Sequence, residues 1–209
     1  MAYQIITAIT NFIILPWKGK CTGAENIPRT GAIIAANHAS YLDHFVIGTN
    51  IMYKAQRVPY YLAKIEHFEG MQRLWHKQLP AIPVDREKGG KKALKKAIQH
   101  LKKGDIIMMY PEGTRTLTGR MNRARTGVAR LAMSAKVPVI PMGITNTFKI
   151  LPKGKLFPRF GLKADLNIGK PLYFDDYYGK ENDRKSLRKV TTKIMKEIAK
   201  LADKKYDFK

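Results

Sequence analysis

Short apolar runs alternate with longer amphipathic stretches along this chain, and no other feature constrains its fold more. Runs with the length and composition of buried strands occur at Ala32–Ala36, Val58–Ala63, Ala81–Val84, Ile106–Tyr110, Val137–Ile144 and Lys163–Gly169. Helical patterns occupy the intervals, at 41–52, 68–78, 89–103, 123–135 and 183–204. Such alternation predicts an α/β fold with a central, largely buried mixed sheet flanked by helices. A length of 209 residues suits one domain.

The first 17 residues carry no charged side chain, and Pro16 should end any helix there. A helix of about 15 residues spans about 22 Å, which is short of the roughly 30 Å of bilayer hydrocarbon. We therefore expect residues 1–19 to be an N-terminal apolar helix, followed by one larger domain at 20–209. This helix either packs on the core or lies at a membrane interface as a shallow anchor, with Trp17 at headgroup level.

The charge of the chain is strongly basic. Lys and Arg number 39 against 16 Asp and Glu, which gives a net charge of +23. Such a surface attracts nucleic acid, anionic lipid headgroups, phosphorylated substrates or an acidic carrier protein, unless the lysines form only a solvated surface. The lysine-rich helix expected at 89–103 has either a solvated or a membrane-facing basic side. It lacks aromatic residues, and no nucleic-acid-binding motif is present, so we expect no nucleic-acid partner.

A histidine and an aspartate, His38 and Asp43, follow the strand expected at Ala32–Ala36. Sites form at strand ends in open α/β sheets. On one helix, a five-residue spacing would put the two side chains about 140° apart, so the pair needs a turn between them. Ser40 can supply that turn as an N-cap, because Asp43 then stands at the capping-box position. Its carboxylate would fix the histidine tautomer. A loop histidine beside a plain capping carboxylate is the alternative.

No side chain recommends itself as a nucleophile for such a base. The serines Ser40, Ser134 and Ser186 lie outside any G-x-S-x-G elbow, and Cys21 has no activating partner nearby in the sequence. His38 is therefore expected to take a proton from a substrate hydroxyl that attacks directly. A lone cysteine forms no internal disulfide, which suits a reducing compartment, and no Cys/His cluster has the spacing of a zinc site.

Two more polar clusters follow expected strands. The segment 110–116 reads YPEGTRT, and the segment 81–86 reads AIPVDR. Gly113 permits a tight turn, and the guanidinium of Arg115 suits bidentate phosphate binding. A turn with a surface ion pair explains either segment alone. Polar clusters at the ends of three strands together indicate one shared site.

In their order and spacing, these motifs resemble those of the glycerolipid acyltransferases typified by 1-acyl-sn-glycerol-3-phosphate acyltransferase, the PlsC-like family. The segment 37–43 (NHASYLD) matches the H-x4-D block, and 110–116 matches the F-P-E-G-T-R-S block. The segments 82–86 (IPVDR) and 137–141 (VPVIP) resemble the second and fourth blocks. The resemblance covers residues 20 to 175. H-x4-D alone is a weak pattern, but together with P-E-G-T-R it is highly specific.

The resemblance implies a PlsC-like fold and a mechanism. His38 would be the general base and Asp43 its orienting partner, and the acceptor hydroxyl would attack the thioester directly. Acyl-CoA or acyl-carrier protein would be the co-substrate, with no cofactor and no metal. The residues implied to bind substrates are Arg86, Glu112, Gly113, Thr114 and Arg115 on the acceptor side, and Pro141 on the acyl-chain side.

The activity implied is acylation of the free hydroxyl of lysophosphatidic acid to give phosphatidic acid. An anionic membrane surface is the expected partner, with a peripheral or monotopic protein on the cytoplasmic face. Three alternatives stay open. The acceptor could be glycerol 3-phosphate, another lysophospholipid or a lipid-linked sugar. The chain could also be an inactive membrane-binding homologue, or a basic nucleic-acid- or membrane-binding module without catalysis.

Overall fold

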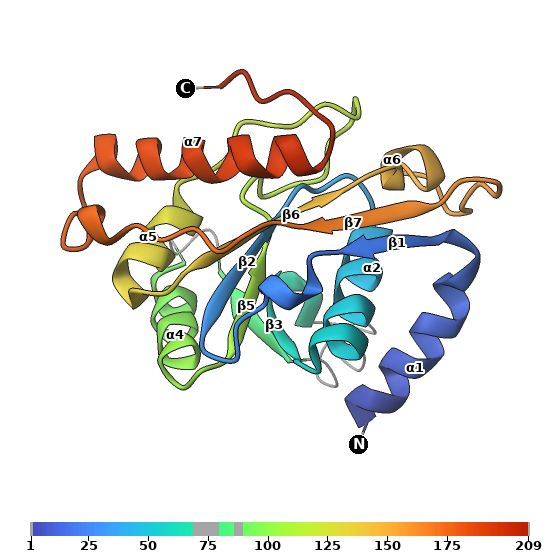
Figure 1. The fold of residues 1–209 in the computed structure, drawn as a ribbon, viewed down its shortest axis with the longest axis horizontal. Helices are drawn as coiled ribbons and strands as arrows, with labels where there is room; N and C mark the ends of the chain where they lie inside the picture. Colours follow the sequence, from blue (N-terminus) through green and yellow to red (C-terminus); the bar gives the residue numbers. More distant parts are fainter. Residues whose placement is uncertain (1, 69–79, 86–89, 209) are drawn as a thin grey trace.

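A seven-stranded sheet forms the centre of the structure (Figure 1). This computed structural model describes residues 2–68, 80–85 and 90–208. Neighbouring strands are parallel except at the β6–β7 pair, which is antiparallel. In spatial order the strands are β1 (Lys18–Thr22), β7 (Ala164–Ile168), β6 (Val139–Ile144), β2 (Ala32–Ala36), β5 (Ile106–Met109), β3 (Pro59–Lys64) and β4 (Ala81–Val84). The mixed sheet confirms the predicted fold class.

Helices cover both faces of this sheet (Figure 1). The α-helices are α1 (Ala2–Ile14), α2 (Leu42–Asn50), α4 (Lys91–Lys102), α5 (Gly127–Ala135), α6 (Thr147–Ile150) and α7 (Arg184–Leu201). A π-helical turn at Ile51–Ala55 continues α2. Short 3-10 helices lie at Leu15–Trp17, Ala24–Asn26, Ile65–Phe68 and Asp175–Tyr177.

The central strand β2 divides its side chains between two hydrophobic cores. Ile33 and Ala35 join the core beneath α4, α5 and α7, whereas Ile34 joins the core beneath α2 and the end of α1. Alternate residues of a strand point to opposite faces, so a strand buried on both sides must be apolar throughout. All five β2 residues are fully buried. This explains why β2 was predictable as a continuous apolar run.

The predicted strands all form, with ends within two residues of their expected positions. The strand β1 was not predicted, because its sequence KGKCT is that of a half-exposed edge strand and carries no apolar run. The helix predicted from residue 123 begins only at Gly127, since the backbone N–H groups of Asn122 and Ala124 are bonded to Glu112 and Tyr206. The helix predicted at 68–78 falls outside the described residues, apart from Phe68 at the end of a 3-10 helix.

Neighbouring strands β2 and β5 send their following chains to opposite faces of the sheet. The chain leaves β2 for α2, which packs in one core, and leaves β5 for α5, which packs in the other. In open α/β sheets, ligands bind at the carboxyl ends of the strands where the connections diverge in this way. His38 follows β2 and Glu112 follows β5, so both stand at this position.

The N-terminal helix α1 packs against α2 and ends at Ile14, with Pro16 in the following 3-10 turn, as predicted (Figure 1). Ile14 and Trp17 are buried against the sheet, but most apolar side chains of α1 are exposed. Within the described part of the chain, no helix is long and apolar enough to cross a membrane. The predicted division between residues 19 and 20 falls inside β1 and stays a prediction.

Candidate active site

The paired side chains of His38 and Asp43 lie at the carboxyl end of β2. Nδ1 of His38 is 2.9 Å from Oδ2 of Asp43. The carboxylate is completely buried, whereas 12% of the histidine side chain is exposed. The predicted turn therefore does bring residues five positions apart into contact. The histidine is accessible to a substrate, and the aspartate behind it is not.

A single oxygen of Asp43 collects three donors. Oδ2 accepts the backbone N–H groups of Ala39 (2.7 Å) and Ser40 (2.8 Å), in addition to its contact with the histidine ring. An oxygen that accepts two backbone N–H groups acts as an acceptor toward the ring as well, so Nδ1 of His38 carries the hydrogen. The other ring nitrogen, Nε2, then keeps its lone pair and can take up a proton.

Ser40 contributes to this turn differently from the prediction. The N-cap of α2 is Tyr41, one residue later than predicted, and no side chain caps it. Half of the expected capping box is present, because Asp43 accepts the N–H of Ser40. The Ser40 hydroxyl accepts the N–H of Leu42 (3.1 Å) and donates to the carbonyl of Leu151 (2.7 Å). Ser40 thus joins the His38–Asp43 turn to the segment that follows α6.

Glu112 holds two loops together from the end of β5. Its Oε1 accepts the backbone N–H of His38 (2.9 Å), and its Oε2 accepts that of Asn122 (2.6 Å). A further backbone bond, from Thr116 N–H to the His38 carbonyl (3.0 Å), closes the junction. The P-E-G-T-R segment and the His38–Asp43 turn are therefore joined by hydrogen bonds into one unit.

Glu112 is 4% exposed as a residue, and burial raises the pKa of its carboxyl group from 4.5 to about 7. The backbone N–H groups of Asn122 and His38 and the amine of Lys204 oppose the rise, while the charge of Asp43 adds to it. The Lys204 amine donates to the carbonyl of Gly119 (2.6 Å), and burial lowers the pKa of this lysine. A nearby cation thus compensates a carboxyl group placed away from water.

Tyr110 packs against the His38 side of the His38–Asp43 pair. Its ring lies parallel to the His38 ring, with centroids 3.8 Å apart and planes 9° from parallel. Burial raises the pKa of Tyr110 well above its usual range, so its hydroxyl stays protonated and can donate to Nδ1 of His44, 3.3 Å away. Sequence reasoning treated Tyr110 only as the end of a strand. The aromatic residue that opens the motif was the available signal.

Asn37 fixes the end of β2 and was also missed by sequence reasoning. Its side chain is buried and bonds both the N–H (2.8 Å) and the carbonyl (3.0 Å) of Ile144 on β6. A polar side chain directly after five apolar strand residues was its signal. These bonds hold β2 and β6 together one residue before His38.

The guanidinium of Arg115 lies over the ring of Tyr41, with Cζ 3.5 Å from the ring centroid. Its Nη1 is buried and has no hydrogen-bond partner among the described residues. A buried donor without a partner costs free energy, and an anionic ligand would remove that cost. Arg115 is therefore the described cation best prepared to receive a phosphate.

The other predicted substrate residues are dispersed. Gly113 adopts a left-handed conformation (φ 72°), which confirms the tight turn, and Thr114 is exposed beside it. Pro141 is buried within β6 and paired with Ala35, so it lies farther down the sheet than the His38–Asp43 turn. Arg86 lies outside the described residues. In the described part of the chain, no three His, Cys, Asp or Glu side chains gather as metal ligands.

Comparison with known proteins gives a consistent family. The acyltransferase family model matches residues 18–145. The 1-acyl-sn-glycerol-3-phosphate acyltransferase of Bacillus subtilis (strain 168) is 32% identical over 176 residues, which are 79% of this chain and 80% of that protein. The chloroplastic enzyme BAT2 of Brassica napus is 28% identical over 75% of this chain, and the match spans 46% of its length, about half.

A solved structure agrees with these relatives. The crystal structure of the 1-acyl-sn-glycerophosphate (LPA) acyltransferase PlsC from Thermotoga maritima superposes with a TM-score of 0.73 and 25% identity. The superposition covers 98% of this chain and 81% of that one. The family match spans more than half of the chain and includes both the H-x4-D turn and the P-E-G-T-R loop. The chain therefore belongs to the acyltransferase family and is an acyltransferase.

Proposed function

We propose that this acyltransferase transfers an acyl group from a thioester to the free hydroxyl of 1-acyl-sn-glycerol 3-phosphate, which gives phosphatidic acid. The observation that carries the proposal is the pair at the end of β2, in which a buried aspartate holds a partly exposed histidine through Nδ1. The acceptor class is taken from the names of related proteins in the same family. Acyl-CoA or acyl-carrier protein would be the donor.

The reaction needs one proton to move twice. Nε2 of His38 takes the proton of the acceptor hydroxyl as its oxygen attacks the thioester carbonyl carbon. When the tetrahedral intermediate collapses, the carbon–sulfur bond breaks and the thiolate takes the same proton from His38. The products are an ester and a free thiol, and the enzyme returns to its starting state. Asp43 stabilises the imidazolium that exists between the two transfers.

Arg115 would bind the acceptor phosphate, because its unpartnered Nη1 and flat guanidinium match the geometry of phosphate oxygens. Arg86 remains a predicted second cation for the same group. We assign Glu112 mainly to positioning, since both of its carboxylate oxygens are already bonded to backbone N–H groups. Direct contact of Glu112, Gly113 or Thr114 with the acceptor, and of Pro141 with the acyl chain, stays a prediction.

The proposed location is the surface of an anionic membrane, at its cytoplasmic face, with the protein bound peripherally or monotopically. The net charge of +23 and the exposed apolar side of α1 support this location. Both the phosphorylated acceptor and the proposed donors carry negative charge, so a basic protein would attract each of them.

The test is an acceptor panel with product identification by mass spectrometry. The purified protein is incubated with lysophosphatidic acid, glycerol 3-phosphate and lysophosphatidylcholine, each with acyl-CoA and with acyl-carrier protein. We expect phosphatidic acid as the main product, and the two donor arms show which thioester is used. Acylation restricted to glycerol 3-phosphate or to lysophosphatidylcholine would overturn the proposed acceptor.

A further inference from the structure

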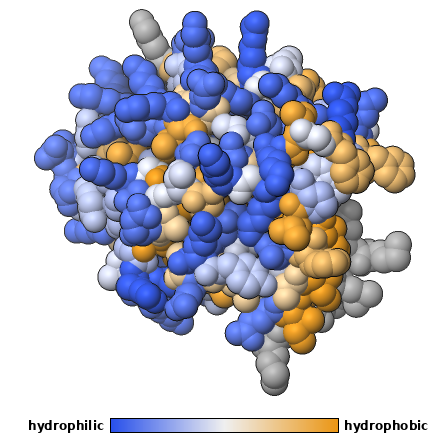
Figure 2. Space-filling view, turned by 45° about the vertical axis from the view of Figure 1, so that its right-hand side comes forward, coloured by the Kyte–Doolittle hydropathy of each residue, from blue (hydrophilic) through white to orange (hydrophobic). Residues whose placement is uncertain are grey.

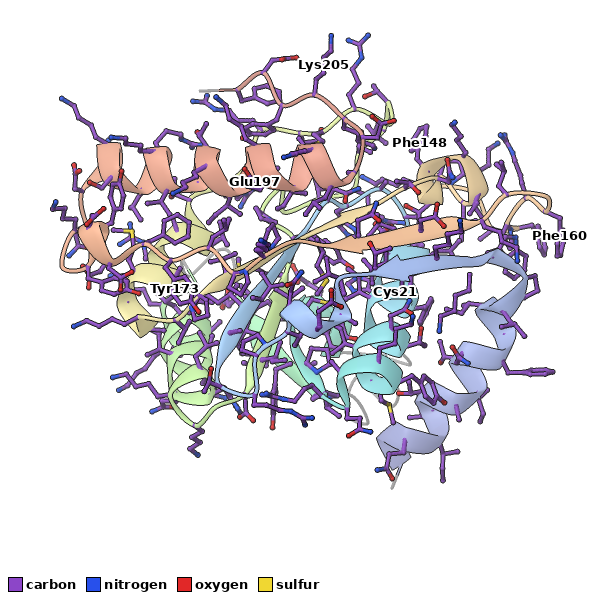
Figure 3. The ribbon with its side chains drawn as sticks, in the orientation of Figure 1. Cys21, Phe148, Phe160, Tyr173, Glu197 and Lys205 are labelled. Atoms are coloured by element: carbon purple, nitrogen blue, oxygen red, sulfur yellow. The ribbon has the colours of Figure 1, made fainter. Side chains whose placement is uncertain are left out.

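Large apolar side chains are exposed on a loop far from α1 in sequence. In the segment 151–161, Leu156 is 86% exposed, Phe157 84% and Phe160 74%. Figure 3 shows Phe160 pointing outward from the end of the molecule at which α1 joins β1. Soluble surfaces rarely gather exposed side chains of this size without a partner.

This loop is continuous with α1 through Trp17. The rings of Trp17 and Phe160 are 4.8 Å apart, and the indole Nε1 of Trp17 donates to the carbonyl of Arg159 (2.8 Å). The exposed apolar residues on this part of the molecule are Ile5, Ile9, Phe12, Ile13 and Leu15 at the N-terminus, and Leu156, Phe157 and Phe160 in the loop. We call these eight side chains the apolar platform. Figure 2 shows hydrophobic surface gathered along the right-hand side of the molecule, while most of the remaining surface is hydrophilic.

Backbone bonds hold the loop in shape. Arg159 N–H donates to the Ile150 carbonyl (2.9 Å) at its base, and Lys155 N–H donates to the Pro152 carbonyl (3.1 Å) nearer its tip. The tip residues Leu156 and Phe157 are therefore presented outward by a closed loop. The entropy cost of ordering them against a partner is correspondingly reduced.

Basic side chains surround the tip. Exposed lysines and arginine at 153, 155, 159 and 163 alternate with the apolar residues. Exposed aromatic and aliphatic side chains bordered by cations suit the interface of an anionic bilayer, where rings enter the acyl boundary and cations meet phosphates. A protein partner that fitted so basic a rim would need an acidic border around an apolar centre.

We propose that the loop 151–161 is a second membrane-inserting element, which enters an anionic bilayer together with α1 as one apolar platform. This inference adds a second contact to the membrane location proposed above. It rests on that location and on no other part of the proposed function. The loop also touches the site, because the Ser40 hydroxyl, within the catalytic turn, donates to the carbonyl of Leu151. Insertion of the loop would thus set the catalytic turn at a fixed height above the lipid acceptor.

The first experiment measures binding to vesicles that contain phosphatidylglycerol. Leu156→Ser/Phe157→Ser is compared with Tyr173→Ser, which changes an aromatic residue that is 59% exposed at the opposite side of the molecule from Phe160 (Figure 3). We expect the double variant to bind at least about tenfold more weakly, because two large apolar side chains are lost from the bilayer. The Tyr173 variant should bind as the wild type. Equal binding by the double variant and the wild type would overturn the proposal.

A second measurement reports insertion directly. The chain has one cysteine, so the Cys21→Ser/Phe157→Cys variant takes a single bimane label at the loop tip. Its emission should shift to the blue on vesicles, and brominated lipid should quench it. The same label in Cys21→Ser/Tyr173→Cys should show neither change. A label at position 157 that stays water-exposed on bound protein contradicts insertion.

Two further arms separate this proposal from its rivals. If the double variant abolishes self-association in solution and leaves vesicle binding unchanged, the loop docks a second copy and the proposal is wrong.

Activity is also compared on lysophosphatidic acid in vesicles and on a short-chain, monomeric form. The double variant should lose at least about tenfold more activity on the vesicle-borne acceptor. Failure of the wild type to acylate either form would refute the proposed function while leaving the binding result intact.

Discussion

The ring of Tyr110 lies against the ring of His38 at a centroid distance of 3.8 Å, while Asp43 holds the same histidine at Nδ1. Tyr110 thus holds the imidazole of His38 at one face of the ring, and Asp43 holds it at one nitrogen. The stacking ring belongs to the residue directly after β5 and the carboxylate to α2, so the ends of two different elements orient one ring.

Replacing Tyr110 tests the stack. Tyr110→Leu should lower kcat about tenfold or more with little change in the KM of either substrate, because the imidazole loses the wall that holds its plane. Tyr110→Phe keeps the ring and loses only the hydroxyl contact with His44, so it should retain most of the activity. Steady-state kinetics decide, and a Leu variant as fast as the wild type would exclude a role for the stack.

Asp43 contacts His38, the proposed base, and also accepts two backbone N–H groups of the turn. Asp43→Asn should lower kcat by about 10²–10⁴, since a neutral amide whose oxygen keeps these contacts no longer stabilises the imidazolium. Asp43→Ala should in addition unfold more easily, because the buried N–H groups of Ala39 and Ser40 lose their acceptor, at about 1–3 kcal/mol each. Urea denaturation of the two variants separates these effects. Equal free energies of unfolding for the Ala and Asn variants would contradict the role of Asp43 as acceptor for these two N–H groups.

Glu112 should titrate near neutrality. Burial raises its folded pKa from 4.5 to about 7, so folding favours the protonated form. The resulting stabilisation is complete below pH 4.5 and is lost as the pH rises through about 7, with a total of up to about 3 kcal/mol. Carbon-13 NMR of the glutamate carboxyls, assigned with Glu112→Gln, should show one midpoint near 7. The free energy of unfolding should fall from pH 5 to pH 8 more steeply in the wild type than in this variant.

Arg115 is the described residue expected to hold the acceptor phosphate. Arg115→Lys keeps the charge but loses the guanidinium contact with Tyr41 and bidentate bonding, so the acceptor KM should rise about tenfold or more. The KM of the acyl thioester provides the internal control and should change little. A selective rise in the thioester KM would instead place Arg115 on the donor side.

The main features of the fold and of the site were predictable from local sequence. Buried parallel strands read as continuous apolar runs, so β2 and β5 could be located and the motifs at their ends assigned to one site. The edge strand β1 escaped prediction because its residues are polar and its pairing with β7 is remote in sequence. The stack of Tyr110 on His38 and the Glu112 bridge also depend on strand pairing, which residue spacing does not reveal. The capping box failed in part because the Ser40 hydroxyl bonds Leu151, over a hundred residues away.

The central claim is that His38 is the general base, and acyl transfer by His38→Ala tests it most directly. Purified His38→Ala should keep the circular dichroism spectrum of the wild type, since the backbone N–H groups that bond the turn to Glu112 and Asp43 are retained. Its kcat for acylation of lysophosphatidic acid should fall by at least about 10²-fold, the lower end of what general-base catalysis contributes. Turnover close to that of the wild type, in protein free of wild-type contamination, would contradict the account.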